Sequence, residues 1–342
     1  MEVELKEVKQ LAKERMKGTC RVCPVCNGKV CAGEVPGMGG SGTGMGFINN
    51  IEALSRVKIL MRTIHEAKNP TLEADLFGQT LSMPIIVAPI TGSEINFGGY
   101  LSEEAYVHTV VEGAHKAGTL AMTGDSGKPE YYQYGLNAIE KVKGQGIPTI
   151  KPREVDAVLM KVREAEAQSV PAIAMDVDGA GLVTMALLGQ PVGPKTKQEM
   201  QAIISQTEKP FIVKGVMTVD EALLCVELGA KAIVVSNHGG RVLDDTVGVA
   251  DVLPEIAKAV KGKLKIIADS GVRSGIDVFK YIALGADLVL VGRPIIVGAV
   301  GGGVQGVELV LDKYKNELYR AMILTGASSV EEISADKIWI QA

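Results

Sequence analysis

The 342-residue chain has few aromatic residues, with one tryptophan and an aromatic share of 4%. It also has no excess of positive charge, because 36 Lys and Arg residues stand against 40 Asp and Glu residues, which gives a net charge of −4. The sequence therefore offers no basic field for nucleic acid, and we expect no nucleic-acid partner. The hydrophobic share of 46% is sufficient for the full core of one large domain.

Long apolar segments are also missing from the sequence. No apolar run approaches the roughly 20 residues that a helix needs to cross a bilayer. The first six residues, MEVELK, lack the apolar segment of a signal peptide. We therefore expect a cytoplasmic protein without a membrane span.

Cysteine is too scarce and too clustered for a disulfide framework, since there are five cysteines and four of them fall within 12 residues. These four, Cys20, Cys23, Cys26 and Cys31, have the spacing C-x2-C-x2-C-x4-C. The spacing is close to that of ferredoxin segments that hold iron–sulfur clusters, and it also suits tetrahedral zinc. Free thiols, or a redox pair at Cys23 and Cys26, are the alternatives. Cys225 lies in an apolar helical pattern and is expected in the core.

From Met83 onward, the sequence alternates between short apolar runs and helical patterns. The runs have the length and the β-branched content of buried strands, and they cover residues 85–88, 119–122, 147–150, 172–175, 211–213, 232–235, 265–268 and 288–291. Helical patterns lie between most of them, at residues 103–117, 152–167, 219–228, 252–260 and 276–284. Eight repeats of strand and helix predict an α/β fold of the (β/α)8 TIM barrel type.

The remaining residues predict the domain organisation. Residues 1–80 form an N-terminal extension, which starts with an amphipathic helix at residues 3–17, and residues 81–342 form the barrel, with closing helices from residue 298. The glycine-rich segment at residues 37–46 is interpreted as a lid or linker. A dinucleotide-binding loop is disfavoured, because no apolar strand precedes this segment.

The predicted strands end in residues that suit a ligand site, and loops at the carboxyl ends of barrel strands build such sites. After strand six, a glycine-rich turn sets His238 and Arg241 three residues apart. Strand five ends at Lys214, and strands seven and eight are followed by Asp269, Ser270, Gly271, Arg273, Gly292 and Arg293. Two clusters of glycine and arginine on adjacent late strands are typical of the phosphate site of such barrels.

In order and spacing, these segments resemble the FMN-dependent α-hydroxy-acid oxidising family, which includes glycolate oxidase, lactate oxidase and the flavin domain of L-lactate dehydrogenase. The similarity covers most of residues 80–335 and rests on residues 83–89, 213–216, 236–241, 269–277 and 291–294. It implies an FMN-binding barrel, a small 2-hydroxy acid as substrate, and a homo-oligomer, namely a tetramer by the family's pattern.

The resemblance also implies a role for each site residue. His238 would be the active-site base, Arg241 would bind the substrate carboxylate, and Asp176 would orient and stabilise the imidazolium. Lys214 would stabilise the anionic reduced flavin. The other residues that would hold the flavin are Ala88, Pro89, Ile90, Ser236, Asp269, Ser270, Gly271, Arg273, Gly292 and Arg293. Elementary chemistry agrees, because an imidazole accepts a proton near neutral pH and a guanidinium binds a carboxylate through two N–H groups.

The substrate side departs from the family's pattern. No tyrosine precedes Tyr100, and apolar residues 181–185 replace a second arginine. Thr149, Lys151 and Ala174 stand where the family has glutamine, tyrosine and threonine. Lys151 would supply a replacement charge. Tyr131, Tyr132 and Tyr134 would either restore a phenolic hydroxyl or pack over the barrel rim.

Three functions are compatible with these residues. The leading one is FMN-dependent oxidation of an L-2-hydroxy acid to the 2-oxo acid. A four-thiolate cluster near the flavin would permit electron transfer to an acceptor protein and would favour a dehydrogenase over an oxidase. The second is a flavin barrel of other chemistry, such as a type 2 isopentenyl diphosphate isomerase, against which His238 and Arg241 argue. The third is a non-catalytic flavin or metal-cluster electron carrier or redox sensor.

Overall fold

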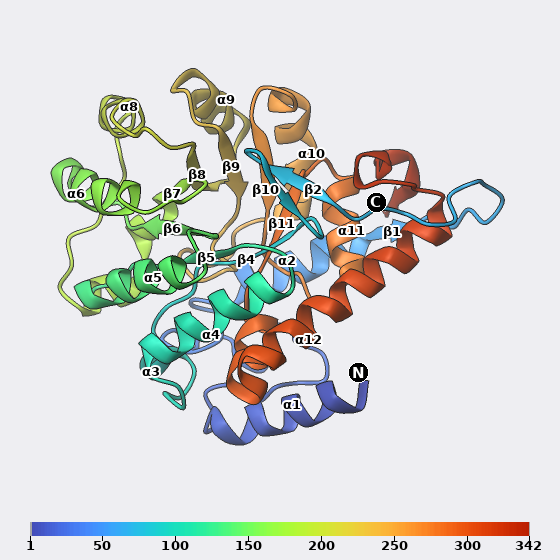
Figure 1. The fold of residues 1–342 in the computed structure, drawn as a ribbon, viewed down its shortest axis with the longest axis horizontal. Coiled ribbons are helices and arrows are strands. Elements are labelled where there is room, and N and C mark those ends of the chain that lie inside the picture. The colour runs from blue at the N-terminus through green and yellow to red at the C-terminus, as the bar shows by residue number, and fades with distance from the viewer. Residues whose placement is uncertain (1, 342) are drawn as a thin grey trace.

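The computed structural model describes residues 2–341, and its centre is a closed barrel of eight parallel strands in the order β10-β11-β4-β5-β6-β7-β8-β9 (Figure 1). The strands are β4 (Ile85–Val87), β5 (Ala121–Thr123), β6 (Gly146–Ile150), β7 (Ile173–Asp176), β8 (Phe211–Val216), β9 (Ala232–Val235), β10 (Lys265–Ala268) and β11 (Leu288–Val291). All eight predicted strands and the TIM-barrel fold are confirmed.

Both faces of the barrel strands are buried, which explains why the strands appear in the sequence as continuous apolar runs. Ile86 and Leu290 are register partners on β4 and β11 and belong to a cluster inside the barrel. Their neighbours Ile85 and Val291 point the other way and belong to the larger core shared with the helices. Alternate residues of one strand thus fill two cores.

Helices surround the barrel (Figure 1). They are α4 (Glu103–Lys116), α5 (Pro129–Lys141), α6 (Val155–Glu166), α8 (Lys197–Ser205), α9 (Val219–Glu227), α10 (Val249–Val260), α11 (Gly275–Ala283) and α12 (Arg293–Thr325). The five predicted helices correspond to α4, α6, α9, α10 and α11. Four of the helices, α4, α8, α9 and α11, begin with a capping side chain. In each case its hydroxyl oxygen accepts a hydrogen bond from the backbone N–H three residues later, and the capping residues are Ser102, Thr196, Thr218 and Ser274.

The N-terminal extension packs against the barrel and its last helix. Helix α1 (Glu2–Arg15) confirms the predicted amphipathic helix and lies against α12 (Figure 1). It is followed by α2 (Met45–Arg56), β1 (Val57–Ile59) and the hairpin β2 (Ala74–Leu76) with β3 (Gln79–Leu81).

The C-terminal segment differs from the prediction of closing helices. Helix α12 ends at Thr325, and after two short 3₁₀ turns the chain forms β12 (Ile338–Ile340), which pairs antiparallel with β1. The prediction was wrong here because the partner strand, β1, lies about 280 residues away in the sequence.

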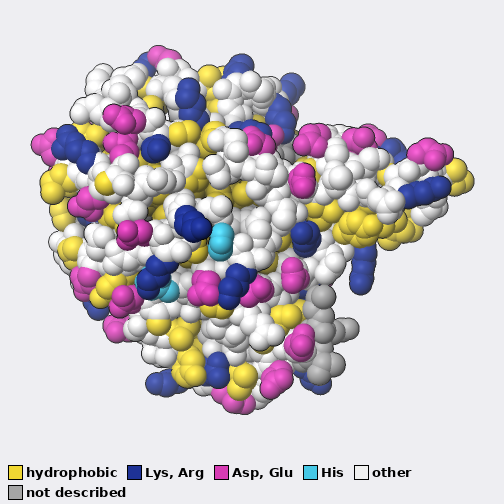
Figure 2. Space-filling model, in the orientation of Figure 1, with side chains coloured by type: hydrophobic (Ala, Val, Ile, Leu, Met, Phe, Trp, Pro, Cys, Tyr) yellow, Lys and Arg dark blue, Asp and Glu magenta, His cyan; other side chains and the backbone are white. Residues whose placement is uncertain are grey.

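Among the described residues, α12 is the one helix long and apolar enough to cross a membrane. More than half of its most apolar window is buried, and it packs against α1, α4 and α11. We therefore assign its apolar content to the core. On the face shown in Figure 2, acidic and basic side chains are interspersed without an extended region of either sign.

Candidate active site

A cavity opens at the carboxyl ends of the barrel strands, with about 1110 Å³ of empty space including its open mouth. Most of the predicted site residues line it: Ala88, Pro89, Ile90, Asp176, Lys214, His238, Arg241, Asp269, Ser270, Gly271, Arg273, Gly292 and Arg293. Ser236 lies behind the wall and is completely buried. Its hydroxyl accepts hydrogen bonds from the Lys214 ammonium (3.3 Å) and from the backbone N–H of His238 (3.0 Å). Ser236 therefore positions two site residues.

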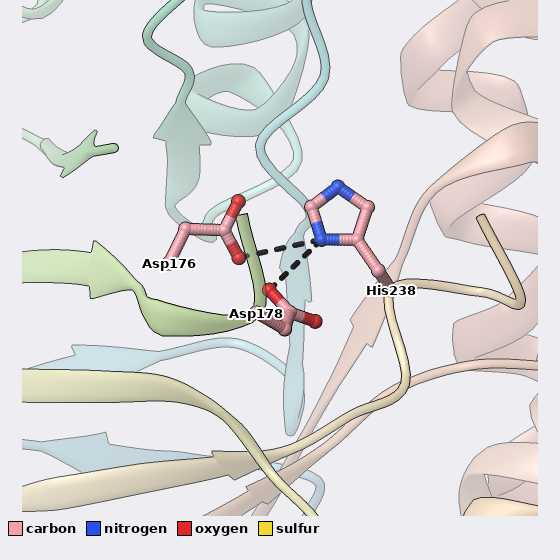
Figure 3. Close-up of side chains that lie close together, drawn as sticks. All are labelled: Asp176, Asp178 and His238. Carbon is pink, nitrogen blue, oxygen red and sulfur yellow. Dashed lines mark hydrogen bonds and ion pairs between the residues drawn. The ribbon is translucent and has the colours of Figure 1, made fainter. Parts of the chain in front are cut away.

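His238 presents one ring nitrogen to two carboxylates (Figure 3). Its Nδ1 lies 3.0 Å from Oδ1 of Asp178 and 3.5 Å from Oδ1 of Asp176. Because an ionised carboxylate only accepts hydrogen bonds, Nδ1 carries the hydrogen and Nε2 keeps its lone pair. In Figure 3, Nε2 points away from both carboxylates. The imidazole is thus arranged to accept a proton at Nε2.

Asp178 is a site residue that the sequence analysis missed. It lies in the 3₁₀ turn Val177–Gly181 directly after β7, and it is closer to the imidazole than Asp176 is. A Cβ atom at Gly215 would lie 2.7 Å from the side chain of Asp178, and Gly215 has a φ of 107°, so this position requires glycine. The pattern Asp-x-Asp at a strand end was the available signal.

Asp176 is buried between two ammonium groups. Its Oδ1 accepts a hydrogen bond from Lys214 (3.0 Å), and its Oδ2 accepts one from Lys151. Burial acts to raise the pKa of Asp176, but Lys151, Lys214 and His238 hold it well below its usual value. Burial acts to lower the pKa of Lys214, and the carboxylates of Asp176, Asp178 and Asp269 outweigh it and raise this pKa. Lys214 is therefore a permanent cation in the cavity.

Three arginines reach the cavity without a carboxylate partner among the described residues: Arg241, Arg273 and Arg293. Burial lowers the pKa of Arg241 to about 10, and burial, together with Arg273 and Arg241, lowers that of Arg293 to about 9. One nitrogen of Arg273, Nη2, is buried without a hydrogen-bond partner. Part-buried guanidinium groups without a carboxylate partner favour a bound anion, so this wall of the cavity suits anionic ligands.

The glycine-rich segment covers the arginines. The carbonyl groups of Gly37 and Gly39 accept hydrogen bonds from Nη1 of Arg241 (2.6 and 3.1 Å), and Met38 and Gly39 accept from Arg293 (2.8 and 2.9 Å). Gly37 and Met38 also line the cavity. Within residues 2–341, no strand precedes this segment, which argues against a dinucleotide-binding loop, and its position over the arginines favours the lid of the predicted lid or linker.

Asn96 is a second residue that the sequence analysis missed. It ends the short helix α3 (Ser93–Asn96), and its Oδ1 accepts hydrogen bonds from Arg241 (3.1 Å) and from the backbone N–H of Gly37 (3.2 Å). Its Nδ2 donates to the carbonyl of Thr91 (3.0 Å). Asn96 therefore fixes Arg241 and the covering segment relative to the end of β4, which no local sequence signal indicates.

The substrate side of the cavity contains Thr149, Lys151, Leu182, Thr184 and Met185. The last three precede or belong to helix α7 (Val183–Leu187) and include the apolar residues that replace an arginine. The Thr149 hydroxyl is buried without a hydrogen-bond partner, whereas the Lys151 ammonium is already bound to Asp176.

The prediction of a replacement phenol is wrong for the three tyrosines on α5. Tyr131, Tyr132 and Tyr134 are absent from the described lining of the cavity. The Tyr132 hydroxyl, for example, donates to the carbonyl of Lys161 (2.8 Å). Ala174 points into the barrel interior and also takes no part in the lining.

The four clustered cysteines line a second, adjoining cavity. Cys225 is buried on α9 in the main core, as predicted.

A family model described as FMN-dependent dehydrogenase matches residues 37–187 and 182–340. The chain belongs to this family. It is an enzyme of the FMN-dependent α-hydroxy-acid oxidase and dehydrogenase group, as the strand-end residues predicted. The match favours hydroxy-acid oxidation over the isomerase and the non-catalytic carrier.

Relatives of known activity are similar over most of their length. An L-lactate oxidase of Lactobacillus jensenii is 35% identical over 320 residues, which cover 83% of this chain and 76% of the relative. An L-lactate dehydrogenase of Pseudomonas aeruginosa is 31% identical, with 84% and 89% covered. A mandelate oxidase crystal structure superposes with a TM-score of 0.82 at 29% identity and covers 99% of this chain and 98% of that one.

The residues of the cavity fit FMN. Arg273 and Arg293 offer buried guanidinium groups without a carboxylate partner among the described residues, which suits a phosphate. At Gly292, after β11, an added Cβ atom would lie 3.2 Å from the side chain of Ile90, after β4. Glycine therefore keeps the space between these two strand ends open. Lys214, on β8, supplies a fixed positive charge at a different place in the cavity wall from these two arginines.

Proposed function

We propose that this enzyme oxidises an L-2-hydroxy acid to the 2-oxo acid, with His238 as the base and Arg241 as the group that binds the substrate carboxylate. This proposal rests on one observation. His238, whose Nε2 is free, and Arg241, which has no carboxylate partner among the described residues, line the same cavity. Oxidation of an α-hydroxy acid needs both groups, one for the proton and one for the anion.

Arg241 has one edge available for a carboxylate. Its bonds to Gly37, Gly39 and Asn96 use both hydrogens of Nη1 and one of Nη2. Nε–H and the second Nη2–H have no partner among the described residues, and these two donors form the edge that binds a carboxylate at two points. Two-point binding fixes the orientation of the α-carbon relative to the other groups of the cavity.

One of the two hydrogens that the substrate loses, on its hydroxyl group and its α-carbon, goes as a proton to Nε2 of His238. The carboxylates of Asp178 and Asp176 then stabilise the imidazolium, because both lie within 3.5 Å of Nδ1. FMN, when bound, would accept the two electrons together with the second hydrogen that the substrate loses. Lys214 keeps its charge and thus favours negative charge near it in the cavity.

The wall beside Arg241 favours a substrate with an apolar side chain. Leu182 and Met185 line the cavity where the family's pattern has a second arginine, and Phe97 belongs to the same lining, so a second anionic group on the substrate has no partner at Leu182 and Met185. We infer that monocarboxylic 2-hydroxy acids, with lactate as the smallest test compound, are preferred over dicarboxylic ones.

The test is anaerobic mixing of the FMN-loaded enzyme with L-lactate and longer apolar L-2-hydroxy acids, while the flavin absorbance is followed. We expect flavin bleaching with at least one of these acids, and in His238→Ala the same FMN content with bleaching slowed by roughly a hundredfold or more. Unchanged bleaching in His238→Ala, or no bleaching of the wild-type protein with any acid tested, would refute the proposal.

Two arginine variants separate substrate binding from cofactor binding. Arg241→Lys keeps the charge but loses the two-point edge, so we expect a higher KM with FMN retained. Arg273→Ala should instead lower the FMN content after gel filtration. A loss of FMN in Arg241→Lys and full retention in Arg273→Ala would reverse these assignments.

A further inference from the structure

Four cysteines from one short segment gather around a single cavity that the proposed reaction does not use. Cys20, Cys23, Cys26 and Cys31 line it together with apolar side chains of α1 and α12, including Leu5, Val8, Val297 and Val310. All four are free thiols, and all four are partly shielded from solvent. The empty space of the cavity is about 1080 Å³ including its mouth, so the cavity has room for a ligand larger than one ion.

In this structure the sulfurs are not drawn together around the position of a single metal ion. Tetrahedral zinc with Zn–S bonds of about 2.3 Å holds its sulfurs about 4 Å apart. Among the described residues, the one group of three or more possible ligands within 4.8 Å of one another is Asp176, Asp178 and His238, so no three of the cysteines meet that distance. A four-iron cluster binds one cysteine at each iron corner and therefore holds its four sulfurs farther apart.

Positive charge surrounds the cysteines, as an anionic cluster needs. The cations that line the cavity are Lys9, Arg21, Arg273, Arg293 and Lys313. Arg21 and Lys313 are paired with Glu34 and Glu317, whereas Arg273 and Arg293 have no carboxylate partner within residues 2–341. These two part-buried guanidinium groups line both cavities, so their positive charge lies between the phosphate part of the FMN site and the thiolates of a cluster.

The cysteine cavity and the FMN cavity share a wall. Met38, Arg273 and Arg293 line both cavities. The Arg273 Nε also donates to the backbone carbonyl of Cys26 (3.1 Å), so this arginine connects the cysteine segment to the part of the site that suits the phosphate. A ligand on the cysteines would lie directly behind the two arginines.

We propose that Cys20, Cys23, Cys26 and Cys31 bind a four-iron, four-sulfide cluster in the cavity that shares Arg273 and Arg293 with the FMN site. The cysteines precede residue 37, where the match to the family model begins, so the cluster site is an addition to the family's barrel. The proposal concerns binding at these thiols, and it holds or fails independently of hydroxy-acid turnover.

The deciding measurement is made on the full-length protein purified without oxygen, so that no variant needs to fold. We expect roughly four iron and four acid-labile sulfide ions per chain, with a broad absorbance near 400 nm in addition to the flavin bands and a paramagnetic signal after reduction with dithionite. Zinc in place of iron, or neither metal in protein that retains FMN, would overturn the proposal.

Matched variants locate the cluster. The double variant Cys23→Ser/Cys26→Ser should lose more than nine-tenths of the iron and sulfide, whereas Cys225→Ser, which changes a buried thiol on α9 in the core, should keep both. Full iron content in the double variant would show that the iron is bound elsewhere and would refute these ligands.

Discussion

At the scale of single residues, two aspartates two positions apart have opposite electrostatic roles. The pKa of Asp176 is held well below its usual value by Lys151, Lys214 and His238, which outweigh its burial. For Asp178, burial outweighs the attraction of Lys214 and His238, and its pKa is raised. Asp176 thus neutralises the two lysines, while Asp178 makes the shorter contact with the imidazole.

The lowered pKa of Asp176 determines how this group contributes to stability across the pH range. A carboxyl group whose pKa is lower in the folded state stabilises the fold fully above its unfolded pKa of about 4. That contribution is lost only as the pH falls through the lower folded value. The Asp176 network is therefore constant over the neutral range in which the imidazole works.

Asp178→Asn tests the role of the carboxylate beside His238. The amide oxygen of asparagine still accepts a hydrogen bond from Nδ1, so the ring keeps its orientation while the charge that stabilises the imidazolium is lost. We expect flavin reduction by the hydroxy acid to slow roughly a hundredfold with unchanged FMN content, measured by stopped-flow absorbance.

The control for this variant is Asp75→Asn, which changes an exposed aspartate on β2 that does not belong to the described lining of the cavity. It should reduce its flavin at the wild-type rate. A rate in Asp178→Asn within twofold of the wild type would show that Asp176 alone supports the imidazole.

At the scale of elements, the segment between β4 and α4 depends on one buried carboxyl group. Oε2 of Glu103 accepts hydrogen bonds from the backbone N–H groups of Gly92 (2.9 Å) and Ser93 (2.7 Å). This contact holds the start of α3, which carries Asn96, next to the cavity. One carboxyl group at the start of α4 thus positions a partner of Arg241.

The stability of this segment should depend on pH. Burial raises the pKa of Glu103 from 4.5 to about 7, against the two backbone hydrogen bonds. A raised pKa means that the contribution of this group is fully present below pH 4.5 and is lost as the pH rises through 7.

The free energy of unfolding is measured by urea unfolding at pH 5 and at pH 8, for the wild type and for Glu103→Gln. We expect the difference between the two proteins to change by on the order of 3 kcal/mol from pH 5 to pH 8, with the wild type losing stability. Glu104→Gln, an exposed change at the next position of α4, is the control and should follow the wild type at both pH values. Parallel pH profiles for the wild type and Glu103→Gln would contradict the raised pKa.

At the scale of the whole molecule, the antiparallel pairing of β1 with β12 joins the N-terminal extension to the C-terminal segment, and apolar side chains are exposed at that corner. The loop after β1 protrudes at the right of Figure 1, and Figure 2 shows apolar side chains along it. Met61 is 69% exposed, Ile64 100% and Trp339 on β12 54%. Exposed apolar side chains gathered in this way are typical of contact surfaces between subunits.

We therefore expect a homo-oligomer that is formed through this corner. Met61→Lys/Ile64→Lys should lower the molar mass measured by light scattering after gel filtration, because a charged side chain is costly to bury between subunits. Met160→Lys is the control, since Met160 is 60% exposed on α6, at the opposite side of the molecule. An unchanged mass in the double variant, or a monomeric wild type, would contradict the expectation.

By itself, the sequence determined the barrel and most of its cavity wall. Strands that are buried on both faces must be continuously apolar, and the residues that follow them must meet at one rim, so Lys214, His238 and Arg293 could be brought together from sequence position alone.

Only the tertiary structure decided which groups contact one another at that rim. Arg241 contacts Gly37 across 204 positions of the chain and Asn96 across 145, and β12 pairs with β1 across a still longer separation. The same is true of Asp178 beside His238 and of the tyrosines on α5 that face away from the cavity. Periodicity fixes the face of an element on which a side chain lies, whereas a hydrogen bond depends on the distance between elements, which packing of the whole core sets.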